Sequence, residues 1–282
     1  MAKKQPVLFT FHKVRELGEQ GDPEAWRAFL NFYGPLYLRL LDIYLPGVAE
    51  AGARMLEKLL EGLAENNFER FRSTSRQSER EFLTEVRAQL LDLAATSLSL
   101  AAGAPGDVDG AWSVGVEKLT NLLQGLPLVH QEMLFLKLAG YGDPTIEGML
   151  RVAPRVAEKA FERLPASFSQ APRSPEDRCP WPAEWLSVLR EARAMKKENC
   201  PEPHQLLRMQ DGQVSWYDKE PVEKHVARCL RCLESWAALR EVSYWRRVAT
   251  PISAAQVERF LQALPVAVAP EKSFLKRVLG GS

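Results

Sequence analysis

The feature that most constrains the fold is a set of metal-binding side chains near the end of the sequence. His225, Cys229 and Cys232 form a His-xxx-Cys-xx-Cys pattern, and Cys200 stands upstream with 24 residues between it and the histidine. A Cys/His/Cys/Cys set is typical of a closed, tetrahedral zinc site with a structural rather than a catalytic role. We therefore predict that Cys200, His225, Cys229 and Cys232 hold one structural Zn²⁺, with His225 and Cys229 on one helix face.

The sequence leaves alternatives to this site open. The cysteines of the pattern can be reduced thiols beside a surface histidine, with no metal. His204, one turn after Cys200, is an alternative fourth ligand or a support for the ligands. Cys179 is expected to be a free thiol, because its spacing to His225 fits a metal site less well.

Composition excludes several classes of protein. A chain of 282 residues has room for two or three small domains, and its net charge of +1 gives no overall attraction to nucleic acid or anionic membranes. No apolar run is long enough to span a bilayer, and Met1–Pro6 begins no signal peptide. Cysteines clustered with a histidine indicate metal in a reducing compartment rather than disulfides. We expect a cytoplasmic protein without membrane contact.

Helical periodicity runs through the first part of the chain. Asp22 is a candidate cap and Pro23 fits the first helical position, while Gly34–Pro35 is expected to end that helix and start another. Further apolar stripes predict a third helix from about Val48 and a fourth around Phe82. Alternating patterns long enough for a sheet are missing, so residues 1–102 are predicted to form an all-helical domain.

The rest of the chain divides at changes of composition. Residues 101–110 are rich in small residues, Gly and Pro, and predict a domain boundary. Short helical patterns around Gly140–Pro144 predict a helix-turn-helix domain over 103–166. A Pro- and Ser-rich linker is expected over 167–198, with a short amphipathic segment near Trp185. A zinc-binding helical domain over 199–248 and a C-terminal helix and tail over 249–282 complete the predicted all-α chain.

The first unit resembles region two of the bacterial extracytoplasmic-function sigma factors. Leu17–Trp26 and Tyr33–Tyr37 are similar to the Gly-Asp-x-Glu-Ala-Phe and Tyr-x-Pro-x-Tyr phrases that open this region, and Phe68–Arg72 and Phe82–Leu83 match later phrases. The resemblance implies a helical domain that binds RNA polymerase and promoter DNA.

Two departures weaken the expectation of promoter binding. Val48–Arg54 keeps one acid, Glu50, where the family has an acidic phrase that grips the polymerase clamp. Leu93–Leu100 carries no Lys or Arg where the family has a basic cluster. A surface without positive charge gains almost nothing from releasing the counterions of DNA phosphates, so we expect weak DNA binding at most.

The second unit resembles region four of the same family. Ile146, Leu150 and Val152 match its Glu-Ile-Ala-x-x-Leu-Gly-Val pattern, and the helix that follows is about one turn shorter than the family's. The resemblance makes Arg151, Arg155 and Lys159 candidate DNA contacts, and Arg155 and Lys159 lie four apart on one helix face. Glu158 and Glu162 on the same helix oppose such contacts.

Residues 200–232 resemble the zinc-binding anti-sigma domain, a small helical module that holds sigma factors inactive. Asp211–Gly212 between Cys200 and His225 strengthens the likeness. The helix that follows carries a wide apolar stripe, which is either core against the zinc unit or a surface for a helical partner. The stripe consists of Leu233, Trp236, Leu239, Val242 and Trp245.

Two functions follow from these resemblances. The first is a sigma-like regulator without promoter binding, which contacts RNA polymerase or a sigma or anti-sigma protein. Its zinc module would restrain or dock the sigma-like part, and the departures favour this function. The second is an active sigma factor that binds core RNA polymerase and promoter DNA and is autoregulated by its fused anti-sigma-like domain. We expect no enzyme, because the sequence has no Gly-rich phosphate loop and no serine elbow.

Overall fold

The structure is a computed structural model that describes residues 10–46, 49–74, 78–101, 115–162, 177–195 and 198–264. All regular elements in these ranges are α-helices, thirteen in number, and the described residues contain no strand. The predicted all-α class is therefore confirmed for this part of the chain. Most of the predicted boundary at 101–110 and the tail after residue 264 lie outside the described residues, as does the N-terminal segment before residue 10.

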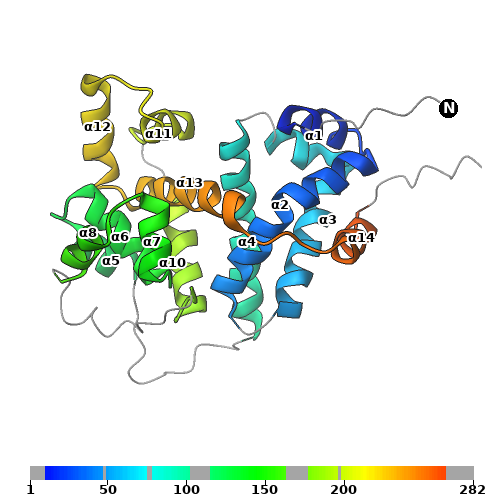
Figure 1. Cartoon of the computed structure of the whole chain (residues 1–282), viewed down its shortest axis with the longest axis horizontal. Helices are drawn as coiled ribbons and strands as arrows, with labels where there is room; N and C mark the ends of the chain where they lie inside the picture. The colour runs from blue at the N-terminus through cyan, green and yellow to red at the C-terminus, as the bar shows by residue number, and fades with distance from the viewer. Residues whose placement is uncertain are drawn as a thin grey trace, which may run out of the picture.

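The N-terminal lobe consists of four helices in sequence and one from the far end of the chain (Figure 1). Its members are α1 (Phe11–Gly18), α2 (Pro23–Tyr44), α3 (Ala49–Thr74), α4 (Glu79–Ala101) and α14 (Ala254–Gln262). Asp22 caps α2, because its Oδ1 accepts a hydrogen bond from the backbone N–H of Ala25 at 2.9 Å. Aromatic rings fill the core, where Trp26 contacts Phe29, Phe68 and Phe71.

The break expected at Gly34–Pro35 is wrong, because α2 is one continuous helix with Pro35 inside it. A proline inside a helix lacks one N–H donor and crowds the preceding turn, which usually kinks or ends the helix. Here Pro35 and its neighbours from Tyr33 to Tyr37 are all buried, and this packing outweighs the local cost. The chain instead turns inside α3, where Asn66, Asn67 and Phe68 have positive φ.

The middle lobe contains four short helices: α5 (Val116–Leu123), α6 (Leu128–Leu138), α7 (Asp143–Leu150) and α8 (Pro154–Phe161). Next along the described chain is α10 (Pro182–Ala194), within the segment expected to be a linker. Trp185, Leu186 and Leu189 of α10 are buried, and the helix packs against α4 and α13. Residues 182–194 are therefore part of the core.

One long helix, α13 (Leu230–Val248), connects all parts of the described chain. It follows α11 (Pro203–Gln210) and α12 (Trp216–Val226), which lie above it in Figure 1. It contacts α2 and α4 of the N-terminal lobe, α6 and α7 of the middle lobe, and α10, α11 and α12. From α13 the chain continues to α14, which packs on α2 and α3.

Candidate metal centre

Four predicted ligands meet at the start of α13. The side-chain donor atoms of Cys200, His225, Cys229 and Cys232 all lie within 4.8 Å of one another. The sulfur atoms of Cys200 and Cys229 are 3.9 Å apart. With metal–sulfur bonds of about 2.3 Å, a tetrahedral zinc site separates its sulfurs by roughly 3.8 Å. The cluster therefore has the dimensions of a site for one metal ion and is compatible with zinc.

The ligands come from three short pieces of backbone rather than from one helix. Cys200 precedes α11, His225 lies in the last turn of α12, and Cys229 is the N-terminal cap of α13 with extended backbone angles (φ −129°, ψ 106°). The prediction of His225 and Cys229 on one helix face is therefore wrong. A tetrahedral ion needs ligands from different directions, and the break between α12 and α13 turns Cys229 and Cys232 relative to His225.

The imidazole of His225 supports a metal at this place. Its Nε2 atom is buried and has no hydrogen-bond partner among the described residues. A buried polar atom without a partner costs roughly 1–3 kcal/mol, and a metal–nitrogen bond would remove that cost. The thiol of Cys232, close to Cys229, lowers the pKa of Cys229 to about 4, while the same contact raises the pKa of Cys232. A thiolate is the form that a metal ion requires.

The two other residues considered as ligands stay apart from the cluster. His204 is exposed on α11. The fourth side chain of the cluster is that of Cys200, not that of His204. Cys179 is buried elsewhere, where its backbone N–H donates to the carbonyl oxygen of Ile43 at 2.8 Å. Burial raises the pKa of the Cys179 thiol to about 12, so this residue stays a neutral thiol at physiological pH.

A buried glutamine connects the metal cluster to the middle lobe. The Nε2 atom of Gln131 on α6 donates to the carbonyl oxygen of Ala227 at 3.0 Å, in the turn between His225 and Cys229. The same amide nitrogen donates to the carbonyl oxygen of Leu126 at 2.9 Å. The ligand-bearing turn is thus fixed to α6, and a change at the metal would be felt directly by that helix.

The apolar stripe of α13 lies inside the chain. Its five residues are all buried, with exposed fractions of at most 6%: Leu233, Trp236, Leu239, Val242 and Trp245. They pack in a helix whose neighbours belong to both lobes. Burying a large apolar side chain contributes about 1.5–3 kcal/mol. The stripe therefore packs inside this chain, and its five residues are not an exposed surface for a partner in this structure.

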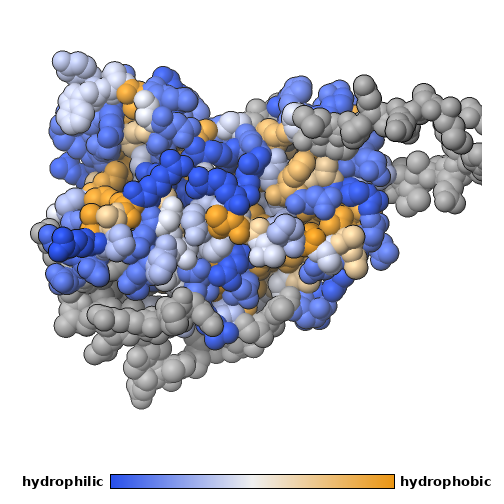
Figure 2. All heavy atoms as spheres, in the orientation of Figure 1, coloured by the Kyte–Doolittle hydropathy of each residue, from blue (hydrophilic) through white to orange (hydrophobic). Residues whose placement is uncertain are grey.

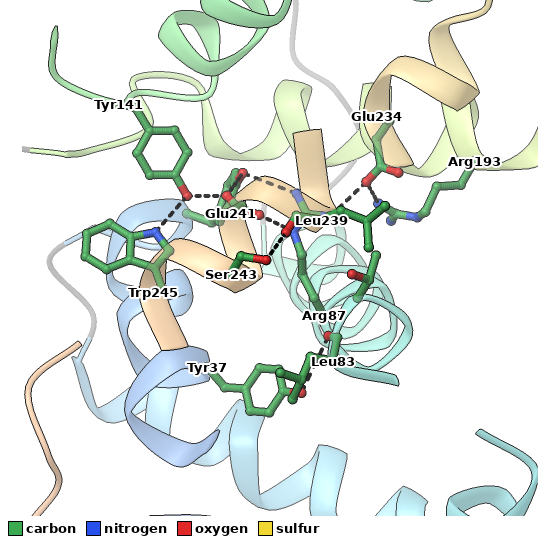
Figure 3. Close-up of polar contacts among 12 residues, drawn as sticks. Tyr37, Leu83, Arg87, Tyr141, Arg193, Glu234, Leu239, Glu241, Ser243 and Trp245 are labelled. Carbon is green, nitrogen blue, oxygen red and sulfur yellow. Dashed lines mark hydrogen bonds and ion pairs between the residues drawn. The ribbon is translucent and has the colours of Figure 1, made fainter. Parts of the chain in front are cut away.

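Buried charges lie beside this stripe (Figure 3). Arg87 of α4 donates through Nη1 to Glu234 at 2.8 Å and through Nε to Glu241, both on α13. Glu241 also accepts from the hydroxyl groups of Tyr44 (2.8 Å) and Tyr141. The guanidinium and both carboxylates are at most 3% exposed. The network therefore links α2, α4, the middle lobe and α13 through fully buried polar groups.

The pKa shifts in the network agree with its hydrogen bonds, in which the tyrosine hydroxyl groups donate and the carboxylates accept. Burial raises the pKa of Tyr44 and Tyr141, and the negative charge of Glu241 raises both further, so both phenols remain donors. Burial raises the pKa of Glu234, but the attraction of Arg193 and Arg87 outweighs it, and the net pKa is lowered. Arg193 of α10 donates to Glu234 at 3.1 Å and also pairs with Asp92. Each buried charge thus has an opposite charge next to it.

Sequence reasoning missed this network. Its members are far apart in the chain, and Arg87 and Glu241 are separated by 154 positions. A weak signal was present, because Glu234 and Glu241 are seven residues apart, two helical turns, beside the apolar stripe of α13. Two acids at that spacing along an apolar face indicate a buried positive partner, although they do not identify it.

The three candidate DNA contacts are divided between two places. Arg151 lies in a left-handed turn at the end of α7 and lines a cleft above α13. Arg155 and Lys159 are exposed on α8 together with Glu158, and neither of them lines that cleft. Of the three side chains, Arg151 alone lines that cleft.

Comparison of the chain with protein-family models, curated protein sequences and solved structures finds no significant match. Among the described residues, no helix combines the length and the apolar character needed to cross a membrane. The metal cluster and the buried network around α13 are therefore the two features on which a function is argued.

Proposed function

We propose that the chain is a sigma-like transcription regulator that acts through protein–protein contacts. In this proposal a zinc ion occupies the Cys200, His225, Cys229 and Cys232 cluster, and the zinc-bound module docks the two sigma-like units onto α13. The observation that carries the proposal is the burial of the apolar face of α13 between both lobes. Because the apolar face of α13 is covered by both lobes, α13 holds these lobes in one arrangement and keeps the surfaces they bury from binding another protein.

A second contact supports restraint. Glu50 is the one acid left in the segment where the resemblance places a polymerase-gripping phrase. Its carboxylate pairs with Arg259 of α14 at 2.8 Å, and Glu57 pairs with the same guanidinium at 2.7 Å. Exposed ion pairs contribute little to stability. The two pairs matter because they place α14 over this part of α3, where it would block another protein from binding.

Chemistry also favours zinc as the ion. Three sulfurs and one imidazole form a soft, four-coordinate donor set, which suits zinc and leaves no open position for a substrate. The zinc therefore has a structural role, in which it fixes α11, α12 and the start of α13. Loss of the ion would release the ligand-bearing turn that Gln131 connects to α6.

Binding to purified core RNA polymerase tests the proposal. The zinc-loaded chain is expected to bind weakly, and Cys229→Ser, which removes a ligand, is expected to bind at least tenfold more tightly because the sigma-like units are released. Cys179→Ser is the matched control, since Cys179 is buried outside the cluster. Biolayer interferometry measures all three proteins.

Two results would contradict the proposal. If neither the zinc-loaded nor the Cys229→Ser protein binds the polymerase, the N-terminal units do not bind RNA polymerase as a sigma factor does. If the zinc-loaded chain binds tightly and directs transcription from a promoter, it is the active, autoregulated sigma factor that the sequence also allows.

A further inference from the structure

A positively charged cleft lies where the lobes meet above α13. It has a volume of about 290 Å³ and is lined by residues of α4, α11 and α13 and by the C-terminal cap of α7. Figure 2 shows a band of hydrophilic side chains across the middle of this face, and the surface is hollowed above it, between the part that carries α11 and α12 and the N-terminal lobe. Five arginines line the cleft: Arg80, Arg151, Arg240, Arg246 and Arg247.

Three of these arginines are neutralised by carboxylates. Arg80 pairs with Asp211 at 2.6 Å, and Arg246 pairs with Glu79 at 2.6 Å. Arg240 pairs with buried Glu132 at 3.2 Å. Five guanidinium groups therefore face three carboxylates, and the cleft keeps an excess of two positive charges.

The excess resides on Arg151 and Arg247. Neither has a carboxylate within ion-pair distance among the described residues, and both are exposed. Arg247 uses its Nε to donate to the backbone carbonyl of Ser243 at 3.1 Å, which leaves its terminal nitrogens for another acceptor. These two side chains come from different elements, since Arg151 follows α7 of the middle lobe and Arg247 belongs to the last turn of α13.

The backbone of Arg151 adds an independent observation. This residue caps α7 in the left-handed conformation, with φ 55° and ψ 44°. Glycine is the residue that usually occupies this position, because any Cβ atom makes the conformation unfavourable. Arg151 thus keeps a side chain where glycine would cost less, which is consistent with a role for its guanidinium.

We infer that this cleft binds a small phosphorylated anion, a phosphate ester or a diphosphate group, through Arg151 and Arg247. Guanidinium groups bind phosphoryl oxygens with two parallel hydrogen bonds, and the excess of two charges matches a dianion. A volume near 290 Å³ is at the lower end of small-molecule sites and is too small for a nucleic-acid duplex. This inference does not depend on the proposed sigma-like function.

Binding would also connect the lobes. The ligand would contact α4, α7, α11 and α13 at once, so it would favour the arrangement in which these elements are packed together. At concentrations well above its dissociation constant, the ligand is expected to raise the melting temperature by roughly 5 °C.

Calorimetric titration of the full, zinc-loaded chain with inorganic pyrophosphate tests the inference. Saturable binding is expected, and Arg247→Ala and Arg151→Gly are each expected to weaken it by about tenfold or more. The glycine variant suits the left-handed backbone, so its loss of affinity reports the missing guanidinium rather than misfolding. Arg155→Ala is the matched control, because this exposed arginine lies outside the cleft, and its affinity is expected to equal that of the unmodified chain.

Three results would overturn the inference. The first is absence of saturable pyrophosphate binding at low ionic strength. The second is equal weakening by Arg155→Ala, which would show non-specific attraction to surface charge. The third is binding of a short DNA duplex that Arg155→Ala and Arg151→Gly weaken equally, because the face would then be a nucleic-acid surface. Far-UV circular dichroism and zinc content confirm that every variant is folded.

Discussion

The N-terminal lobe and the metal module (residues 199–232) are built in opposite ways. In the lobe, α2 alone has 14 buried residues among its 22. In the module, α12 has one buried residue among 11 and α11 has two among eight, while Trp216 and Tyr217 remain exposed. The lobe therefore has an extensive hydrophobic core, whereas the module has few buried residues of its own, and we expect it to depend on metal ligation and on docking against α13.

The two regions are expected to differ most in how far they unfold when the metal ion is lost. Cys229→Ser should remove the ion and unfold α11 and α12, since structural zinc contributes about 10–16 kcal/mol in zinc-finger peptides. Helices α1 to α4 should keep their protection, because the ion lies outside their core. Hydrogen exchange by mass spectrometry, with Cys179→Ser as the control, measures both regions in one experiment. Protected amides in α11 and α12 after metal removal would show that the module has a sufficient core of its own.

An intermediate effect is expected where the lobe meets α13. Arg87→Met removes the positive charge between Glu234 and Glu241 and should cost about 3–5 kcal/mol, because it leaves the buried carboxylate of Glu241 without an opposite charge, while Glu234 keeps Arg193. Arg80→Met, two turns earlier on α4, is the control and should cost at most about 1 kcal/mol, because its pair with Asp211 is partly exposed. Urea unfolding compares them. Equal losses would mean that the buried network contributes no more than a surface pair.

The smallest effects come from two matched helix caps. Asp22 caps α2 in the lobe, and the Oγ of Ser215 caps α12 in the module by accepting from the N–H of Asp218 at 3.3 Å. Either change to Ala should cost about 1 kcal/mol. Asp22→Ala should lower the stability of the lobe, and Ser215→Ala should increase exchange in α12 alone. Hydrogen exchange tests this, and a lobe-wide effect of Ser215→Ala would contradict the separation of the two regions.

Local signals predicted the all-helical class and the four side chains that meet in the candidate metal cluster. The stripe from Leu233 to Trp245 and the cap at Asp22 specify helices through side chains a few residues apart, and the metal pattern is equally local. Pro35 shows where local rules fail, because burial of its neighbours outweighs the proline. The Arg87 network could not be predicted, since its partners meet only after the lobes have packed. The break between His225 and Cys229 could not be predicted either, because the HxxxC spacing fits one continuous helix, and here α12 ends at Val226 while Cys229 caps α13.

The separation of Arg87 from Glu241 has a consequence for the order of synthesis. A ribosome that adds about 5–20 residues per second needs roughly 8–30 s to make the 154 positions between them. During that interval the N-terminal lobe exists without α13, and its charged arginine and the apolar surface around it are open. A chaperone or another helical protein has access to that surface while the chain is being made. Once α13 is complete, the chain itself closes the surface.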